Sequence, residues 1–368
     1  MWKCDYNMSD AYLHHMELDV WKNQVSFNQK WYPAGTFVTE LLNVPSEKID
    51  QIMPCCGAFA KAATAWGEKG GWDAQRELEE MEATFRGYID ALWCCPPFCY
   101  MSRGKEIEGF HRFFFEHGVK AGTEEYEFVV GCLLSVFGIP YHILNFYTIA
   151  ENLERNFYAR LRRRGEAALT LATAQCFENR DFQKLLEALP GIEHYPISLS
   201  PKYELCYNFA TFPDKANSII FLQHPAFERL FDFYVFDLLN GIHHGHAPSK
   251  CQNCGRYYLT TSAHASKYCD GIAPQDANYT CRQYGAMKNQ KDKNANHPVY
   301  RTFNTRTGTI RTHHRRGKIS YALRVMALNL AAEYRDKALL DSAYAADGYE
   351  RDMEQETLYA EVRRRLEE

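Results

Sequence analysis

The sequence predicts a mainly helical fold with a small cysteine-rich module in its C-terminal part. Apolar residues recur at three- and four-residue steps in several separate stretches, which is the spacing of helices that bury one face. The chain has 368 residues, of which 46% are hydrophobic, so it can form a sizeable core. Four cysteines are grouped between Cys251 and Cys281. We expect a helical body over residues 1–245, the cysteine module with a basic segment over 246–319, and C-terminal helices over 320–368.

The helices are assigned from apolar stripes and from residues that start or stop a helix. A stripe of Leu78, Met81, Phe85, Ile89 and Leu92 follows Asp73, which can cap the N-terminus. Helices are expected over residues 73–95, 106–116, 123–138, 141–164, 227–241, 320–334 and 347–368, with two short ones over 167–189. The best strand candidate is 218–221.

An uncharged stretch over residues 128–150 is long enough on paper to cross a bilayer. Gly138 and Pro140 interrupt it, and its most apolar part, 129–137, is too short to span. We therefore expect a buried helix, a turn and a second helix, and no membrane contact.

The N-terminal residues lack the basic start and apolar run of a signal peptide, so we expect a cytoplasmic protein. The chain has 13 cysteines. In a reducing compartment, metal binding or burial explains cysteines better than disulfides do.

The cysteine module contains the ligands of a structural zinc site. Cys251 and Cys254 form a Cys-x-x-Cys-Gly turn, and Cys269 and Cys281 follow. Four thiolates complete a tetrahedral Zn²⁺ site and leave no open position for catalysis. His264 is an alternative to one of the thiolates. We expect a strand after Cys254 that pairs with residues leading to Cys269, and a helix from Cys281, which together form a treble-clef-like finger with a β-hairpin and a helix.

A resemblance rests on these residues. Residues 225–320 resemble a bacterial family of unknown function with a C-terminal four-cysteine zinc finger. The shared positions are 231–241, Cys251-Gln-Asn-Cys254-Gly-Arg-Tyr-Tyr, Lys267-Tyr-Cys269, Thr280-Cys281-Arg282 and Gly285-Ala286. The finger is also loosely similar to that of CGNR-type proteins, which are regarded as DNA-binding, although Thr280-Cys281-Arg282-Gln283 stands where Cys-Gly-Asn-Arg would be expected. The resemblance implies that the four cysteines bind zinc, and it implies no activity.

Charge is distributed unevenly along the chain. The net charge is −4, yet 11 Lys or Arg residues and one acidic residue lie between Arg282 and Arg324. Tyr, Phe and His side chains are interspersed among them. Cations for phosphates and rings for stacking are the composition that nucleic-acid binding requires. The expected contacts, to DNA rather than RNA, are Arg282, Lys288, Arg301, Arg306, Arg311, Arg315, Arg316 and Lys318.

The arginines do not gather on one face in a helical projection, and residues 305–312 around Gly308 suit a hairpin equally well. The basic segment can instead be a solvated surface or a contact with the acidic remainder of the chain. The leading hypothesis is a nucleic-acid-binding zinc-finger protein, a regulator or an accessory factor of a mobile element. The alternative is a protein-interaction module in which the finger clamps the C-terminal helices.

An enzyme with its active site in the helical body is the weakest alternative. The sequence has no Gly-rich phosphate loop, nucleophile elbow or His-Glu-x-x-His motif. Four other groups contain residue types found in functional sites but are more simply explained as structural or solvated residues: His313 and Arg316 with Tyr344 and Tyr349, as in tyrosine recombinases; His243, His244 and His246; Cys55, Cys56, Cys94, Cys95 and Cys99; and Arg160, Arg162, Arg163 and Arg164.

Overall fold

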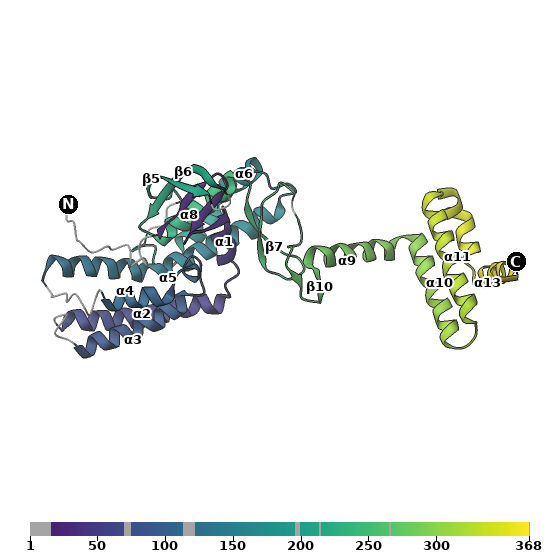
Figure 1. The fold of residues 1–368 in the computed structure, drawn as a ribbon, viewed down its shortest axis with the longest axis horizontal. Helices are drawn as coiled ribbons and strands as arrows, with labels where there is room; N and C mark the ends of the chain where they lie inside the picture. Colours follow the sequence, from purple (N-terminus) through teal and green to yellow (C-terminus); the bar gives the residue numbers. More distant parts are fainter. Residues whose placement is uncertain are drawn as a thin grey trace. The chain divides into compact units, whose positions relative to one another are not determined.

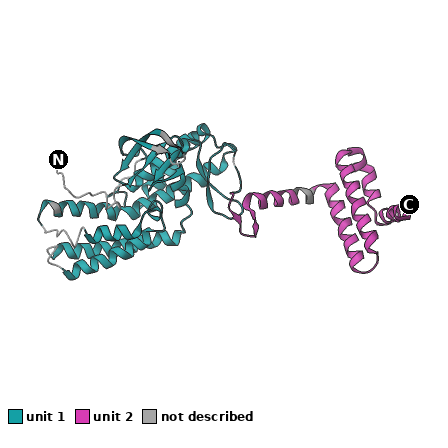
Figure 2. Cartoon of the chain, in the orientation of Figure 1, with its two compact units in different colours: residues 1–269 teal, residues 270–368 magenta. Residues whose placement is uncertain are grey.

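The computed structural model describes residues 16–69, 75–112, 122–195, 199–212, 215–264 and 266–367. The chain forms two compact units, Met1–Cys269 and Asp270–Glu368 (Figure 2). The domain boundaries expected from the sequence are 245/246 and 319/320. The boundary between the two units therefore lies inside the segment expected to hold the finger.

The first unit is built mainly from helices, and the prediction of a mainly α fold is confirmed. All five apolar residues of the stripe expected in α3 are buried, whereas Asp73, expected as its cap, lies outside the described residues. The helices of this unit are α1 Thr36–Leu41, α2 Ser46–Glu68, α3 Gln75–Leu92, α4 Arg103–His111, α5 Glu124–Asn156, α6 Glu166–Glu178, α7 Arg180–Glu187 and α8 Leu230–His243 (Figure 1).

Helix α5 runs without interruption through Pro140, so the expected break between residues 138 and 141 is wrong. The helix starts at Thr123 as expected, and Thr123 caps it by accepting a hydrogen bond from the N–H of Tyr126. Its buried residues continue on both sides of the proline, from Val129 to Leu153. By length and composition alone the helix could also cross a membrane, which is weak evidence because core helices pass the same test.

The first unit also contains an antiparallel sheet, of which the sequence indicated only one segment. The strands are β1 Met16–Glu17, β2 Asp19–Trp21, β3 Gln24–Phe27, β4 Lys30–Pro33, β5 Glu204–Phe212 and β6 Lys215–Phe227. The order is β1-β6-β2-β3-β4, with β5 paired to β6. Asn28 and Gln29 both have positive φ in the β3–β4 hairpin, as a two-residue turn of type I′ requires. Strand β6 therefore pairs both with β5 and with the N-terminal strands β1 and β2, which lie about 200 residues earlier in the chain.

Helix α8 fixes the start of α1 through a buried carboxylate. Asp237 is fully buried and accepts hydrogen bonds from the N–H groups of Gly35 at 2.9 Å and Val38 at 3.0 Å. These are N–H groups at the start of α1, which lack intrahelical partners. Because α1 packs against the strands beside the first cysteine pair, this contact helps to position those strands.

The second unit is a hairpin followed by helices around its own core. Its elements are β9 Ile272–Ala273, β10 Asp276–Thr280, α9 Cys281–Asn296, α10 Pro298–Arg315, α11 Tyr321–Leu340, a π-helical turn Tyr344–Gly348, α12 Tyr349–Asp352 and α13 Gln355–Glu367. The core includes Val299, Ile310, Leu330, Met353 and Leu358. The helix expected from residue 320 is α11, which Ser320 caps, but the helix expected over 347–368 is divided between α12 and α13.

Residues 305–312 are helical, so the hairpin considered for them is wrong. Thr307 and Ile310 are buried in α10, and Phe303 packs against the same core. This apolar stripe at helical spacing outweighs the strand preference of the threonines and the turn preference of Gly308.

Candidate functional site

The first cysteine pair lies in the loop of a β-hairpin. Strands β7 (Ala247–Lys250) and β8 (Tyr257–Thr260) pair antiparallel, with Lys250 opposite Tyr257. Strand β8 was expected to pair with residues leading to Cys269, and this expectation is wrong. Gly255 has a φ of +75° and donates its N–H to the carbonyl of Cys251 at 3.0 Å. Glycine takes this conformation without strain, which explains the Cys-x-x-Cys-Gly pattern.

Cys269 and Cys281, the second cysteine pair, lie beside the first pair and belong to two other segments of the chain. The N–H of Gln252 donates to the carbonyl of Lys267 at 2.9 Å, which brings the chain before Cys269 alongside the first loop. Cys281 is the first residue of α9, as the sequence predicted, and its N–H donates to the carbonyl of Gly271 at 2.7 Å.

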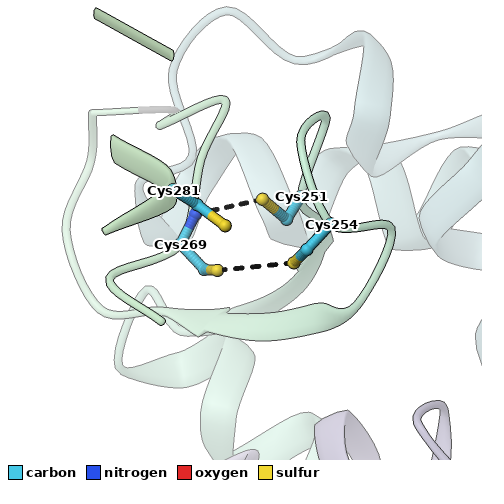
Figure 3. Close-up of side chains that lie close together, drawn as sticks. All are labelled: Cys251, Cys254, Cys269 and Cys281. Carbon is cyan, nitrogen blue, oxygen red and sulfur yellow. Dashed lines mark hydrogen bonds between the residues drawn. The ribbon is translucent and has the colours of Figure 1, made fainter. Parts of the chain in front are cut away.

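The four sulfur atoms form one group (Figure 3). All lie within 4.8 Å of one another, and Cys254 and Cys269 have a sulfur–sulfur distance of 3.7 Å. In a tetrahedral site with Zn–S bonds of about 2.3 Å, the edge between two sulfurs is about 3.8 Å. A disulfide would need about 2.05 Å. The spacing therefore suits four ligands around one metal ion.

The surroundings of Cys251 favour its thiolate. Burial alone raises the pKa of this thiol, but the backbone N–H groups of Cys254, Cys269 and Asn253, with the Cys254 thiol, lower the pKa to about 7. The N–H of Cys269 lies 3.4 Å from the Cys251 sulfur (Figure 3). Thiolates are the form that binds metals, so the loop is organised for metal ligation.

His264 is not a member of the sulfur group. It is exposed and pairs by backbone with Arg163 in an isolated bridge. Among the described residues, the four cysteines are the group of His, Cys, Asp and Glu side chains that can hold a metal ion.

The β7–β8 hairpin is held by side chains that the sequence did not single out. Asn43 accepts a hydrogen bond from the N–H of Tyr257 at 2.7 Å and donates to its carbonyl at 2.9 Å. Glu154, which is buried, accepts from the N–H of Lys250 at 3.1 Å. Neither residue belongs to a recognisable motif, because each forms hydrogen bonds with backbone groups that are far away in the sequence.

The arginine cluster before Gly165 does not form one surface. Arg164 is buried and donates to the carbonyl of Pro248 at 3.3 Å, so it supports the hairpin. Arg160, Arg162 and Arg163 are exposed.

The other histidine and tyrosine groups have separate structural partners. His246 is buried and lies 3.0 Å from the carbonyl of Ala34, while His243 pairs with Glu166 at 3.1 Å. His313 lies 3.1 Å from the hydroxyl of Tyr359. Tyr349 is buried and donates to the carbonyl of Val299 at 3.0 Å, and Tyr344 donates to Asp352 at 2.8 Å.

The remaining cysteine group does not form a multi-ligand site. Cys94 and Cys95 have sulfurs 3.7 Å apart, but no third His, Cys, Asp or Glu completes a cluster with them within the described part of the chain. Burial raises the pKa of Cys56 to about 11, so this thiol stays protonated.

The basic residues expected to contact nucleic acid all lie in the second unit, in α9, in α10 and in the turn after α10. Seven of the eight side chains are exposed, namely Arg282, Lys288, Arg301, Arg311, Arg315, Arg316 and Lys318. Arg282 forms an exposed ion pair with Asp270 at 3.0 Å. Arg306 is half-buried and donates from Nε to the carbonyl of Met353. Arg306 therefore supports the fold of the second unit.

Three of the arginines share one face of α10. Arg301, Arg311 and Arg315 are all exposed and lie 10 and 4 residues apart, which places them within about 80° of one another at 100° per residue. A helical projection of all five arginines does not show this face, because Arg306 points toward the core and Arg316 lies beyond the end of the helix. Assigning α10 as a helix with a buried stripe at Val299, Phe303 and Ile310 would have found it.

The matched family model covers the segment that contains the four cysteines and the basic residues. No curated protein and no solved structure matches the chain. Residues 198–365 match the model of a family of unknown function, DUF6076, and this span contains the four cysteines and all eight basic residues named above.

Proposed function

We propose that the four-cysteine group binds a structural zinc ion and that the chain binds nucleic acid through the basic segment from Arg282 to Lys318. The sulfur spacing and the N–H groups around Cys251 support a tetrahedral thiolate site. Four protein ligands leave no position for a reacting water, so the ion serves the fold. A cytoplasmic location, where thiols stay reduced, agrees with this role.

The zinc would fix the start of the basic segment. Cys281 is both a ligand and the first residue of α9, and Arg282 follows it directly. Helix α9 leads into α10 and the turn with Arg316 and Lys318. Metal binding thus orders the N-terminal end of the helix that begins the basic surface.

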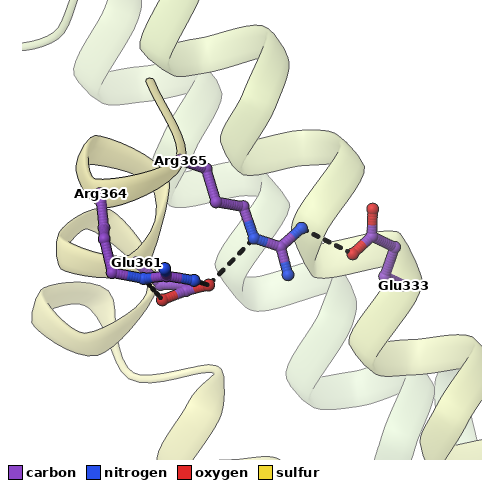
Figure 4. A network of polar contacts seen from close by, with 4 residues as sticks. All are labelled: Glu333, Glu361, Arg364 and Arg365. Atoms are coloured by element: carbon purple, nitrogen blue, oxygen red, sulfur yellow. Dashed lines mark hydrogen bonds and ion pairs between the residues drawn. The ribbon is translucent and has the colours of Figure 1, made fainter. Parts of the chain in front are cut away.

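One contrast supports nucleic-acid binding above the other functions. Within the described residues, Arg301, Arg311, Arg315 and Arg316 form no ion pair. Arginines later in the same unit do: Arg335 pairs with Asp336, and Arg364 and Arg365 pair with Glu361 (Figure 4). The chain contains no acidic residue between Asp292 and Glu333. The charges of Arg301, Arg311, Arg315 and Arg316 are therefore available to an external polyanion.

The test is fluorescence anisotropy of the full chain with labelled nucleic acid across a salt series, with metal content measured on the same sample. Neutralising phosphates releases counterions, so affinity should fall steeply with salt, by about 0.9 in log–log slope per phosphate contact. Replacing Arg311 and Arg315 by Gln should weaken binding and reduce the slope by about 2.

The matched control removes two paired charges from the same unit, Arg364→Gln with Arg365→Gln. This variant loses the same net charge but should keep its affinity and salt slope, since exposed ion pairs contribute little. Absent or salt-independent binding would defeat the proposal and favour the competing function, a protein-interaction module without nucleic acid.

A further inference from the structure

The exposed positions of α10 form a single stripe along the helix. They are Pro298, Arg301, Asn304, Thr305, Gly308, Arg311 and Arg315. Steps of three and four residues keep them on one side of an α-helix. From Arg301 to Arg315 the stripe is about 21 Å long at 1.5 Å per residue. Its ends are cationic, and its middle is polar and small.

The opposite side of α10 fixes the orientation of this stripe. Val299, Thr307 and Ile310 are buried, and Phe303 packs on the same core. Arg335 of α11 lies over the ring of Phe303, 4.7 Å from its centroid. Arg306 is held by the carbonyl of Met353. The helix therefore presents the stripe to solvent in one defined rotation.

Gly308 lies at the centre of the stripe, and the fold does not require a glycine there. A Cβ added at this position would meet no atom within 4 Å. Its backbone is helical, so alanine would be accepted and would favour the helix. Without a side chain on this exposed face, the backbone can be approached closely by another molecule.

We infer that α10 lies in the major groove of duplex DNA, with Gly308 at the closest approach. This inference rests on the proposed nucleic-acid binding and names its target. The major groove of B-form DNA, about 12 Å wide, admits an α-helix, whereas the major groove of duplex RNA is too deep and narrow for side chains to read. Charge complementarity supports this occupant, because the stripe contains three arginines and no carboxylate.

The chemistry of the stripe divides into two roles. Asn304 can form a bidentate pair with adenine, and the methyl group of Thr305 can contact thymine. Arg301 at one end, and Arg311 and Arg315 toward the other, contact phosphates or guanine edges. The middle of the stripe then determines sequence preference, and its ends supply affinity.

The test measures the affinity of the zinc-loaded full chain for three probes of equal length at near-physiological salt. The probes are a duplex DNA pool of random sequence, the matching RNA duplex and single-stranded DNA. Duplex DNA should bind most tightly. The Gly308→Ala variant should melt at a higher temperature than the unaltered protein but bind duplex DNA about tenfold more weakly, since a methyl group holds the helix away from the bases.

The matched control is Gly87→Ala in α3, an exposed helical glycine whose added Cβ also meets nothing within 4 Å. It should raise the melting temperature and leave DNA binding unchanged. Selection from the random pool should enrich a short sequence, and Asn304→Ala should abolish preference at one base pair of it.

The outcomes separate the two proposals. If nucleic acid binds but Gly308→Ala has unchanged affinity, or the RNA duplex or the single strand binds as well as duplex DNA, the major-groove inference is wrong and the proposed function stands. If none of the probes binds, both are wrong.

Discussion

The hydroxyl of Tyr88 in α3 donates a hydrogen bond to the backbone carbonyl of Val136 in α5 at 2.9 Å. Val136 lies four residues before Pro140, whose ring nitrogen has no hydrogen to donate to that carbonyl. Tyr88 is fully buried, so the hydrogen bond is shielded from water. The hydroxyl thus replaces the helical hydrogen bond that Pro140 removes, and this explains how α5 continues through the proline.

This relationship predicts coupling between Tyr88 and Pro140. Tyr88→Phe should destabilise the first unit by about 1–3 kcal/mol, because the Val136 carbonyl loses its donor in a buried place. In a Pro140→Ala background, the N–H of residue 140 can supply the missing hydrogen bond, so the same change should cost less. A double-mutant cycle by urea denaturation measures the coupling energy, and simple additivity would contradict this account.

The same residues show what sequence could and could not predict about the fold. The start of α5 at Thr123 and the start of α11 at Ser320 were predicted, since a cap and its helix are adjacent in sequence. The continuation through Pro140 depends on the side chain of Tyr88, which lies 48 residues before its hydrogen-bond partner Val136. Apart from the strand segment 218–221, the sheet escaped prediction for the same reason, because β1 pairs with β6 far along the chain, as in Met16 with Phe227.

The candidate site divides in a similar way. The cysteines were found because their spacing is itself the signal of a metal site. Asn43 and Glu154, which hold the β7–β8 hairpin, have no such spacing. The exposed stripe of α10 could not be predicted, because the sequence of this segment is compatible with both a helix and a hairpin, and a solvent-exposed face is defined only once the helix is assigned.

Loss of one cysteine should release the metal and disorder the finger locally. Cys281→Ser removes a buried thiol of the proposed zinc site, so bound zinc should fall to near zero, and amides of β7 and β8 should exchange faster. Outside β7 and β8, the residues of the two cores should keep their protection. Cys206→Ser, which changes an exposed thiol outside the group, is the control. Full zinc content in the Cys281 variant would exclude that cysteine as a ligand.

The hairpin should depend on Asn43 for its position. Asn43→Ala removes both hydrogen bonds to the backbone of Tyr257 and should destabilise β8 by about 1–3 kcal/mol. Asn43→Asp keeps an oxygen that can accept from the N–H of Tyr257 and should lose less. Hydrogen exchange of the β8 amides compares the two variants, and equal protection in Asn43→Ala and the unaltered protein would show that the contact contributes nothing.

Acidification should destabilise the first unit through His142. Burial lowers the pKa of His142 to about 4, and the charge of Arg229 adds to this effect. Neither ring nitrogen has a hydrogen-bond partner among the described residues. Between pH 4 and the usual pKa of 6.5, the unfolded chain therefore binds a proton that the folded chain does not. Stability from this group is complete above about pH 6.5 and is lost as the pH falls toward 4.

The variant His142→Leu isolates this contribution. Between about pH 7.5 and about pH 5, the unaltered protein should lose about 2 kcal/mol more stability than the variant. Urea denaturation of both proteins at the two pH values measures the difference, in which all other titrating groups cancel. Equal losses would mean that His142 becomes protonated in the folded protein.

Replacing Arg306 should affect mainly stability, whereas replacing Arg311 in the same helix should affect mainly nucleic-acid binding. Arg306→Ala removes the donor to the carbonyl of Met353, a residue with 0% exposure, and should destabilise the second unit by about 1–3 kcal/mol. Its salt slope in nucleic-acid binding should stay unchanged. Arg311→Ala should leave stability within about 0.5 kcal/mol. It should lower the slope by about 0.9. Both variants lose one positive charge, so equal effects on the slope would mean that net charge alone, and not the exposed face of α10, determines binding.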